Sequence, residues 1–412
     1  MSTILKIDEV GTVLTGKTPK TSASEFWDGN LPFYTPSDMD GRRRLDGVKR
    51  YITEEGLKSV KNSAIPPNSV MVSCIGSDMG KVSLSVQHGV TNQQINTIIP
   101  NEEMVDFLYL YYSLLPRKSE LQMLASGGSA QPILNKGQFS QLEVVIPSLQ
   151  DQKAIAHILG TLDDKIELNQ KMNQTLEDIA KAIFKSWFVD FDPVRAKAEG
   201  RHTGLPPEIS DLFPNEMVDS EIGEIPKGWE SLMILDVAKV TSGKRPPEKE
   251  TAQTNACPYI VYGGAGPMAF CSKPLVFSKP AIITGRVGTL GKVFYLTDDC
   301  WVSDNSILIC DAGLFTPLIF YTLQFMDLSV LNVGSTQPLV TGKDIKNLDL
   351  IGPPTELLQK YIDIFDLIKT RQSVADKERD TLSDLRDTLL PKLISGELRI
   401  PDAEKFLEEA GI

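Results

Sequence analysis

The chain is poor in the residues that build metal and thiol chemistry. Its 412 residues include three histidines and five cysteines. His88, His157 and His202 do not stand at metal-ligand spacing from a cysteine or from one another, and no CxxC pair occurs. A metal site and a disulfide framework are therefore not expected. Scattered cysteines of this kind are typical of reduced core thiols and predict a cytoplasmic protein.

Long apolar runs and catalytic signatures are also missing. No run approaches the roughly 18–20 apolar residues that a membrane span requires, and the N-terminal MSTILKIDEV does not resemble a signal peptide. The Asn/Asp-Pro-Pro-aromatic loop of methyltransferases is absent, as are nuclease-like acid clusters and Ser/His/Asp or Cys/His patterns. We therefore expect no catalytic residue in this chain.

Negative charge is unevenly distributed. The net charge is −12, yet residues 1–150 carry 14 Lys and Arg against 15 Asp and Glu, and residues 226–353 carry 11 against 11. The acidity lies in residues 151–225 and 354–412. A nucleic-acid partner is therefore not excluded by the net charge, because two long segments are close to neutral.

An internal repeat is the most informative feature. Residues 128–147, GSAQPILNKGQFSQLEVVIP, align without a gap on 334–353, GSTQPLVTGKDIKNLDLIGP, at an offset of 206. Near the start of each copy, Gly16-Lys17 matches Gly243-Lys244 at an offset of 227. The first copy therefore carries 21 extra residues. We therefore predict two domains that share the segments at the start and end of the repeat and differ in the residues between them.

A heptad pattern follows each copy. One series of seven-residue steps is Ile155, Leu162, Asn169, Leu176 and Ile183, and a second is Leu159, Ile166, Asn173, Ala180 and Trp187. Tyr361, Ile368, Ala375, Leu382 and Leu389 repeat the first series. Such spacing is typical of a coiled-coil seam. Two long helices that pack antiparallel on each other would bury both stripes, with the asparagines either fixing register or lying in a locally wet seam.

These patterns predict an α+β fold. Two mixed α/β domains in a pseudo-twofold arrangement are separated by two long antiparallel helices that form a coiled coil. The predicted segments are a first domain at 1–150, a long helix at 151–190, an extended, partly ordered linker at 191–225, a second domain at 226–353, a second long helix at 354–396 and a C-terminal tail at 397–412.

One motif suggests nucleotide binding. Gly11–Thr18, GTVLTGKT, matches the P-loop pattern G-x4-G-K-[ST]. A working P-loop needs a strand before it and a helix that begins near its lysine. Pro19 follows at once, and the second copy keeps only Gly243-Lys244. We interpret both strings as exposed turns whose lysines can approach phosphate, and an ATPase remains the alternative.

Residue types that read bases recur in loops of both copies. Arginine pairs with guanine, and Asn or Gln pairs with adenine. Arg42-Arg43-Arg44 is the sharpest basic cluster, and Asn92-Gln93-Gln94 is a run of amides whose counterpart is Asp304-Asn305-Ser306. Each residue alone could be an ordinary solvated loop residue. The candidate DNA contacts are Lys17, Arg42, Arg43, Arg44, Lys49, Lys81, Gln93, Gln94, Gln131, Lys244, Arg245, Arg286, Lys292, Asn305 and Gln337, with specific readers expected where the copies differ.

Three strings carry a resemblance that covers essentially the whole chain. They are FKSWFVDFDPVRAK at 184–197, GEIPKGWE at 223–230 and LLPKLISGEL at 389–398. With them the chain resembles the specificity subunits of type I restriction–modification systems. The first copy lacks a GEIPKGW-like opening, so its N-terminal edge is less well marked.

The resemblance implies a non-catalytic subunit that recognises an asymmetric, bipartite DNA target with two target-recognition domains. The helices would set the half-site separation and dock two modification subunits. Residues expected in the coiled coil or at the partner interface are Leu162, Asn169, Leu176, Ile183, Trp187, Ile368, Leu382 and Leu389. S-adenosylmethionine, ATP and Mg would be bound by partner subunits, including restriction subunits, and not by this chain. A coiled-coil scaffold with two protein-binding heads is a further alternative.

Overall fold

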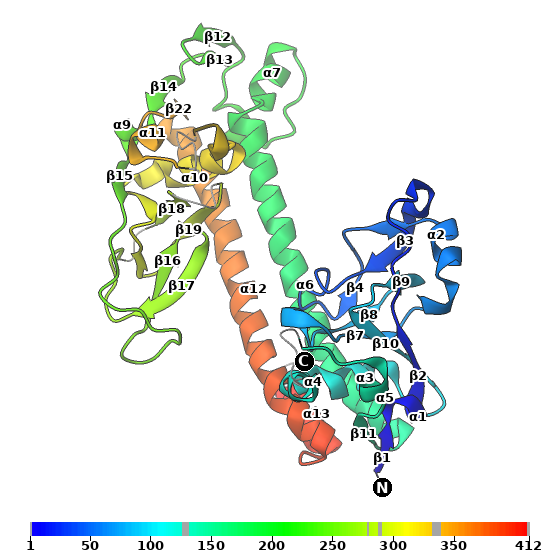
Figure 1. The fold of residues 1–412 in the computed structure, drawn as a ribbon. Coiled ribbons are helices and arrows are strands. Elements are labelled where there is room, and N and C mark those ends of the chain that lie inside the picture. Colours follow the sequence, from blue (N-terminus) through cyan, green and yellow to red (C-terminus); the bar gives the residue numbers. More distant parts are fainter. Residues whose placement is uncertain (1, 126–131, 278–279, 287–290, 332–338, 410–412) are drawn as a thin grey trace. The chain divides into compact units, whose positions relative to one another are not determined.

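The computed structural model describes residues 2–125, 132–277, 280–286, 291–331 and 339–409 (Figure 1). The chain divides into two compact units. Unit 1 comprises Met1–Lys171 and Ala375–Ile412, and unit 2 comprises Met172–Val374. Each unit contains one copy of the repeat and part of each long helix.

Unit 1 is built on a five-stranded sheet of order β2-β10-β7-β8-β4. The first four strands are antiparallel, and β4 adds parallel to β8. A second sheet has the order β5-β3-β9-β6, and β1 pairs with β11. The strands are β1 (Thr3–Lys6), β2 (Gly11–Thr15), β3 (Trp27–Tyr34), β4 (Arg44–Leu45), β5 (Tyr51–Ile52), β6 (Ala64–Ile65), β7 (Val70–Ser73), β8 (Val82–Ser85), β9 (Gly89–Thr91), β10 (Ile95–Pro100) and β11 (Glu143–Ile146).

The helix α3 (Phe107–Leu114) contributes to the main core of unit 1. Asp106 caps it by accepting from the backbone N–H groups of Leu108 and Tyr109, which satisfies two of the free donors at its first turn. Its buried residues share one apolar cluster with β7, β8, β10 and the long helices. The other short helices are α1 (Ile7–Val10), α2 (Glu54–Ser59), α4 (Lys118–Ala125), α5 (Lys136–Ser140) and α13 (Ile400–Glu409), with 3-10 turns at Ser24–Phe26, Lys61–Ser63, Gly76–Asp78 and Leu115–Arg117.

Unit 2 repeats this plan with one strand fewer in its first sheet. Its sheet order β15-β21-β18-β19 matches β2-β10-β7-β8, and a second sheet has the order β17-β16-β20. The strands are β12 (Met217–Ser220), β13 (Gly223–Pro226), β14 (Glu230–Met233), β15 (Lys239–Ser242), β16 (Tyr259–Gly263), β17 (Gly266–Cys271), β18 (Ala281–Gly285), β19 (Val293–Leu296), β20 (Cys300–Val302), β21 (Ser306–Cys310) and β22 (Asp349–Gly352). The helices are α7 (Asp192–Ala198), α8 (Pro207–Ser210), α9 (Ile234–Val237), α10 (Thr316–Phe325) and α11 (Gly342–Lys346), with 3-10 turns at Gly313–Phe315 and Leu328–Leu331.

The repeat is visible in local capping. Asn135 accepts from the backbone N–H of Gln138 at the start of α5, and Thr341 accepts from that of Asp344 at the start of α11. In each case a side-chain oxygen of the later residue accepts a hydrogen bond from the backbone N–H of the cap residue. Both are capping boxes, and they begin equivalent helices 206 residues apart.

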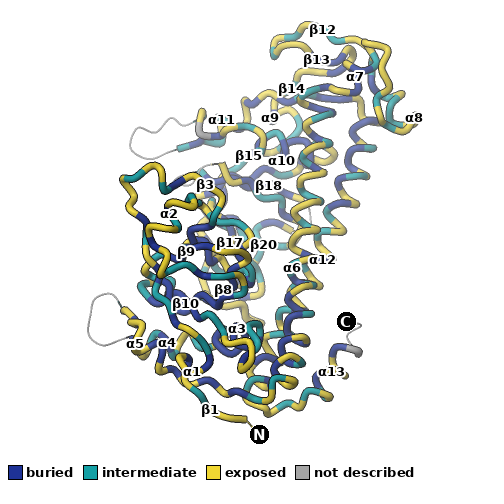
Figure 2. Tube along the Cα trace, turned by 90° about the vertical axis from the view of Figure 1, so that its right-hand side faces the viewer, coloured by how far each residue is buried: buried dark blue, intermediate teal, exposed yellow. Residues whose placement is uncertain are grey.

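The two long helices are α6 (Leu149–Phe188) and α12 (Thr355–Ser395), close to the predicted limits of 151–190 and 354–396. Within each unit they lie side by side and antiparallel (Figure 1), and each shows a buried and an exposed face (Figure 2). The predicted partner residues all lie on the seam, buried or half-buried: Leu162, Asn169, Leu382 and Leu389 in unit 1, and Leu176, Ile183, Trp187 and Ile368 in unit 2. The predicted class, two mixed α/β domains with an antiparallel helix pair, is confirmed.

The predicted extended linker is folded instead. Residues 191–225 form α7, α8, β12 and part of β13, and Phe191, Val194 and Phe213 are buried in the core of unit 2. The Lys197 ammonium donates to the carbonyl oxygens of Ser210 and Phe213, which ties the segment together. Prolines and acidic residues suggested an open chain, but the apolar residues between them bury enough surface to order it.

The C-terminal tail also carries structure, because α13 buries Ala403 and Leu407 in the core of unit 1. Among the described residues, no helix combines the length and apolar character that crossing a membrane requires.

Candidate nucleic-acid interface

A glycine–lysine turn in unit 1 is pressed against a polar loop. The backbone N–H of Gly16 donates to the carbonyl oxygen of Ile95 at 3.1 Å. A Cβ at Gly16 would lie 2.1 Å from the Asn92 carbonyl oxygen and 2.3 Å from that of Thr91. Glycine is therefore required here for close backbone approach. The turn holds Lys17 with its side chain exposed.

The same loop presents the predicted amides. Thr18 Oγ1 donates to Gln93 Oε1 at 2.7 Å, so the turn and the loop are joined. Asn92 Nδ2 donates to Gln94 Oε1 at 2.9 Å, and the backbone N–H of Gln94 donates to Asn92 Oδ1 at 3.1 Å. Gln93 is exposed and Gln94 is half-buried. The structure thus brings Lys17, Gln93 and Gln94 together and restrains both amides.

Unit 2 builds the equivalent arrangement from different side chains. The backbone N–H of Gly243 donates to the Ser306 carbonyl oxygen at 3.0 Å, and that of Lys244 donates to the Val302 carbonyl oxygen at 2.9 Å. A Cβ at Gly243 would lie 2.1 Å from the Ser303 carbonyl oxygen. The Lys244 and Arg245 side chains are exposed at this turn. Each Gly-Lys string directly follows a strand, β2 or β15, and exposes its lysine, but neither string forms a helix or a hydrogen-bonded turn.

Arg286 lies where β18 ends, between two loops. Its N–H donates to the Asn305 carbonyl oxygen at 2.9 Å, and its carbonyl oxygen accepts from Val340 N–H at 3.0 Å. In unit 1 the corresponding bonds are made by Cys74, to Gln94 and from Leu134. Arg286 therefore occupies the position that the buried Cys74 occupies in unit 1. A side chain that differs between the two units at an equivalent position is where a contact to a specific base was expected.

These bonds also correct the predicted pairing of the loops. The sequence alignment placed Asn305 opposite Gln93, whereas the hydrogen bonds make Asn305 the counterpart of Gln94. The two loops have the same length, and only the strand pairing shows that the sequence alignment was shifted by one residue.

The other predicted contacts are dispersed. Lys81 pairs with Asp78 at 2.8 Å and donates to the Pro36 carbonyl oxygen, so it is partly neutralised. Lys292 is exposed, with its ammonium 3.5 Å from the Ala265 carbonyl oxygen. Lys49 is exposed, and its backbone is held by the Asp38 carboxylate. Gln131 and Gln337 lie outside the described residues.

The arginine run does not form an open basic cluster. Arg42 pairs with Asp40 at 2.9 Å and Asp46 at 2.7 Å. Although partial burial opposes ionisation of Asp40, the bonds and charge of Arg42 lower the pKa of that carboxyl below its ordinary value. Arg44 lies over the Phe107 ring at 5.6 Å and donates to Asn68 Oδ1.

Arg43 departs furthest from the expected reader role, since it is 6% exposed and is held by carboxylates of α6. A buried, paired guanidinium is not free to meet a base edge.

Two residues near this surface were not predicted as contacts. Thr18 braces Gln93, and its place in the GKTP string was the available signal. Arg50 is exposed and lies over the Trp27 ring at 3.7 Å. Stacking fixes the guanidinium while its outer edge stays accessible. Proximity to the arginine run was its only signal in the sequence.

The P-loop interpretation is not supported by the local geometry. Gly11–Thr15 forms β2 and is paired along its length with β10. No helix begins at Lys17, and the next helical element in the described chain is the three-residue turn Ser24–Phe26. The backbone N–H groups of this string therefore do not form a phosphate cradle at a helix N-terminus. Among the described residues, no group of three or more His, Cys, Asp and Glu is placed to hold a metal ion.

Comparisons with known proteins agree with the repeat. The model of the type I restriction modification DNA specificity domain matches residues 2–178 and 226–375. The chain is 29% identical to the type I restriction enzyme MjaIX specificity subunit of Methanocaldococcus jannaschii, over 97% of this chain and 94% of the relative. It is 27% identical to the HindI specificity subunit of Haemophilus influenzae, over 88% and 90% of the two chains.

The fold has a solved counterpart. The crystal structure of the S subunit of a type I restriction–modification system from M. genitalium superposes with a TM-score of 0.58 at 18% identity, covering 95% of this chain and 96% of that one. The family match covers both copies of the repeat and well over half of the chain. The chain therefore belongs to the DNA-specificity subunits of type I restriction–modification systems.

Proposed function

We propose that the chain reads an asymmetric, bipartite DNA target with two heads, at residues 1–150 and 226–353. The observation that carries this proposal is the recurrence of one surface in both units. In each, a glycine–lysine turn is hydrogen-bonded onto a loop that bears amide side chains. Lysine supplies phosphate contact, and the neighbouring amides supply hydrogen bonds to base edges.

The two heads differ where base contact is proposed, so their half-sites differ. Unit 1 offers Gln93 and Gln94 on a restrained loop, which suits adenine. Unit 2 offers Arg286 and Asn305, which suit guanine and adenine. Lys17, Lys49 and Lys81 in unit 1, and Lys244, Arg245 and Lys292 in unit 2, are proposed to contact phosphate. Gln131 and Gln337 stay candidate readers.

The long helices are proposed to set the half-site separation and to dock modification subunits. At 1.5 Å per residue, the 40 residues of α6 give a rod of about 60 Å. Apolar side chains remain exposed on the helices of unit 2, at Met172, Ile179, Leu367 and Val374. Exposed apolar side chains grouped on helices are typical of surfaces that a partner covers.

The proposed partners are double-stranded DNA, two methyltransferase subunits and restriction subunits. Methyl transfer and ATP-driven cleavage would take place on those subunits, which would bind S-adenosylmethionine, ATP and Mg. This chain would contribute recognition and geometry without catalytic residues of its own. Its five free cysteines fit a cytoplasmic setting.

The test uses DNA binding by the complex reconstituted with its modification subunits. Replacing Lys17 and Lys244 together by alanine should weaken binding and lower the slope of log affinity against log salt by about 2, since each phosphate contact contributes roughly 0.9. Lys377→Ala, an exposed lysine on α12, is the matched control. A wild-type complex without measurable affinity for duplex DNA would favour the scaffold alternative instead.

A base-reading test separates the two heads. Arg286→Ala should relax base preference in one half-site only, by about 1–3 kcal/mol at one position. Mapping the methylated adenines of cells with wild-type or variant chain reports the preference directly. Changes in both half-sites would contradict the assignment of one head to each.

A further inference from the structure

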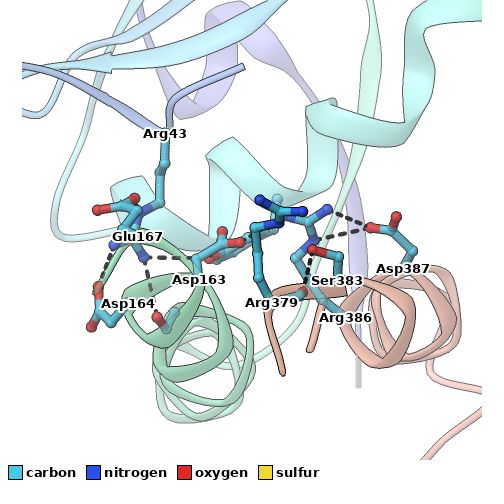
Figure 3. A network of polar contacts seen from close by, with 10 residues as sticks. Arg43, Asp163, Asp164, Glu167, Arg379, Ser383, Arg386 and Asp387 are labelled. Atoms are coloured by element: carbon cyan, nitrogen blue, oxygen red, sulfur yellow. Dashed lines mark hydrogen bonds and ion pairs between the residues drawn. The ribbon is translucent and has the colours of Figure 1, made fainter. Parts of the chain in front are cut away.

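Residues 35–50 of unit 1, here called the insert, carry a buried cation that reaches α6. Arg43 lies in the segment between β3 and β5 and is 6% exposed. Its backbone is fixed, because Leu84 N–H donates to its carbonyl oxygen at 2.7 Å and β4 pairs with β8 beside it. Its side chain leaves the sheet and points to α6 (Figure 3).

Two of the three guanidinium nitrogens of Arg43 donate hydrogen bonds, and Nε makes only a charge contact with a carboxylate. Nη1 donates to the Gly160 carbonyl oxygen at 3.3 Å and lies 3.5 Å from the Tyr112 hydroxyl. Nη2 donates to Asp164, and Nε lies 3.3 Å from Glu167 Oε1. Burial opposes the positive charge, but Tyr112, Asp164 and Glu167 outweigh burial and raise the pKa of Arg43.

The network continues to the second helix. Tyr112 on α3 donates to Asp163 Oδ2 at 2.6 Å, and burial together with this carboxylate raises the pKa of the phenol, so it remains a donor. Asp163 Oδ1 accepts from Arg386 Nη1 of α12 at 2.7 Å. The insert, α3, α6 and α12 are therefore joined through directional, charged hydrogen bonds within unit 1 (Figure 3).

The helix sequence makes room for this contact. Gly160 lies inside α6, where glycine is less favourable than alanine. A Cβ there would lie 3.2 Å from Leu108 and 3.5 Å from Arg43 Nη1. At an offset of 206, the counterparts of Gly160, Asp164 and Glu167 are Asp366, Thr370 and Ser373. The Arg43 clamp is thus specific to the first unit.

We propose that Arg43 is a positioning residue that fixes the angle at which the first recognition domain sits on α6, and so limits the half-site spacings that the chain accepts. This inference rests on the proposed function. Buried ion networks often add little net stability relative to apolar packing, but their geometry is directional. Adding one base pair moves a half-site by roughly 3.4 Å and rotates it by about 35° about the DNA axis. Discrimination between spacings therefore requires that the first recognition domain be held at a fixed angle on α6.

The test compares Arg43→Met with Arg117→Met. Methionine fills much of the arginine volume without charge. Arg117 is also a partly buried arginine of unit 1, but it pairs with Glu120, three residues away, at 2.6 Å. The reconstituted complex is titrated with duplexes that keep both half-sites and change the spacer by one or two base pairs. Arg43→Met should lower the ratio of affinities for the best and next-best spacing about tenfold and leave the bases preferred in each half-site unchanged. Arg117→Met should keep the wild-type profile.

Two results would overturn the inference. One is a wild-type spacing profile in folded Arg43→Met. The other is altered base preference in a half-site, which would make Arg43 a reader. If Arg43→Met does not fold, Asp164→Asn and Glu167→Gln loosen the same clamp, and wild-type profiles in both would equally refute it. Absence of bipartite DNA binding in the wild-type complex would instead reject the proposed function.

Discussion

Alanine at Gly16 or Gly243 tests whether the glycine–lysine turns set the reading surface. A Cβ at either position would lie 2.1 Å from a carbonyl oxygen of the loop beneath, whereas ordinary contacts begin at 3.4 Å. The turn must therefore retreat by roughly 1 Å, and overpacking of this kind typically costs about 1–3 kcal/mol. The retreat would also displace Lys17 or Lys244.

Each substitution should act on one half-site. Gly16→Ala should weaken binding through the first head and Gly243→Ala through the second, each by about tenfold, or about 1.4 kcal/mol. Fluorescence anisotropy with the mapped target, and with versions in which one half-site is scrambled, measures this separately for each head. Thermal unfolding of the same variants reports the packing cost.

Matched glycines supply the controls. Beyond its chain neighbours, Gly47 has no heavy atom within 4 Å of the position that a Cβ would take, and at Gly342 the nearest such atom is 3.9 Å away. Alanine at either should leave affinity and unfolding unchanged. If Gly16→Ala and Gly243→Ala also bind and unfold like the wild type, the close approach does not hold the turns in place, and the reasoning fails.

Two further predictions concern unit 2. Burial opposes ionisation of Glu177, but the Lys369 ammonium at 3.0 Å and hydrogen bonds from Lys369 and Gln372 lower its pKa. Glu177→Gln should therefore cost about 1 kcal/mol near neutral pH. In urea unfolding this difference should fade as the pH falls through the ordinary glutamate pKa of about 4.3 and then through the lowered value. Phe184 is 2% exposed and packs against the rings of Phe188, Tyr321 and Tyr361. Phe184→Ala should lower the free energy of unfolding by about 3–5 kcal/mol in urea unfolding. An effect as small as that of Val189→Ala, at an exposed position, would show that these rings do not form a core.

The helices could be predicted from the sequence because their signal is local. Seven-residue spacing alone identifies the seam that buries Tyr361, Ala375 and Leu389. The exposure of the two Gly-Lys segments was predictable for a related reason, since Gly16 and Gly243 occupy equivalent positions in the two copies. The physical reason for glycine there, a carbonyl oxygen 2.1 Å from a missing Cβ, is a tertiary contact that only coordinates supply.

The Arg42–Arg44 run shows where sequence reasoning reached its limit. Three adjacent arginines look like one basic patch, yet in an extended segment neighbouring side chains leave on different faces. Arg43 therefore turns inward to Asp164, 121 residues further along the chain, while Arg42 finds carboxylates inside its own loop. Nothing in the run itself distinguishes these outcomes. The folded linker was missed likewise, because Phe213 and Val194 are buried only through the tertiary fold.

Charged residues in the seam favour the pairing of α6 with α12 over the pairing of either helix with a second copy of itself. Asp163 and Lys369 are equivalent positions of the repeat, yet they carry opposite charge. In unit 1 the carboxylate of Asp163 on α6 meets Arg386 of α12, and in unit 2 Glu177 on α6 meets Lys369 of α12. Pairing α6 with α6 of a second copy in the same geometry would set Asp163 against Glu177, and pairing α12 with α12 would set Lys369 against Arg386. Like charges in a partly buried seam are costly, so the charge pattern favours the α6–α12 pairing of a single chain, even though the apolar seam of each helix would also fit its own copy.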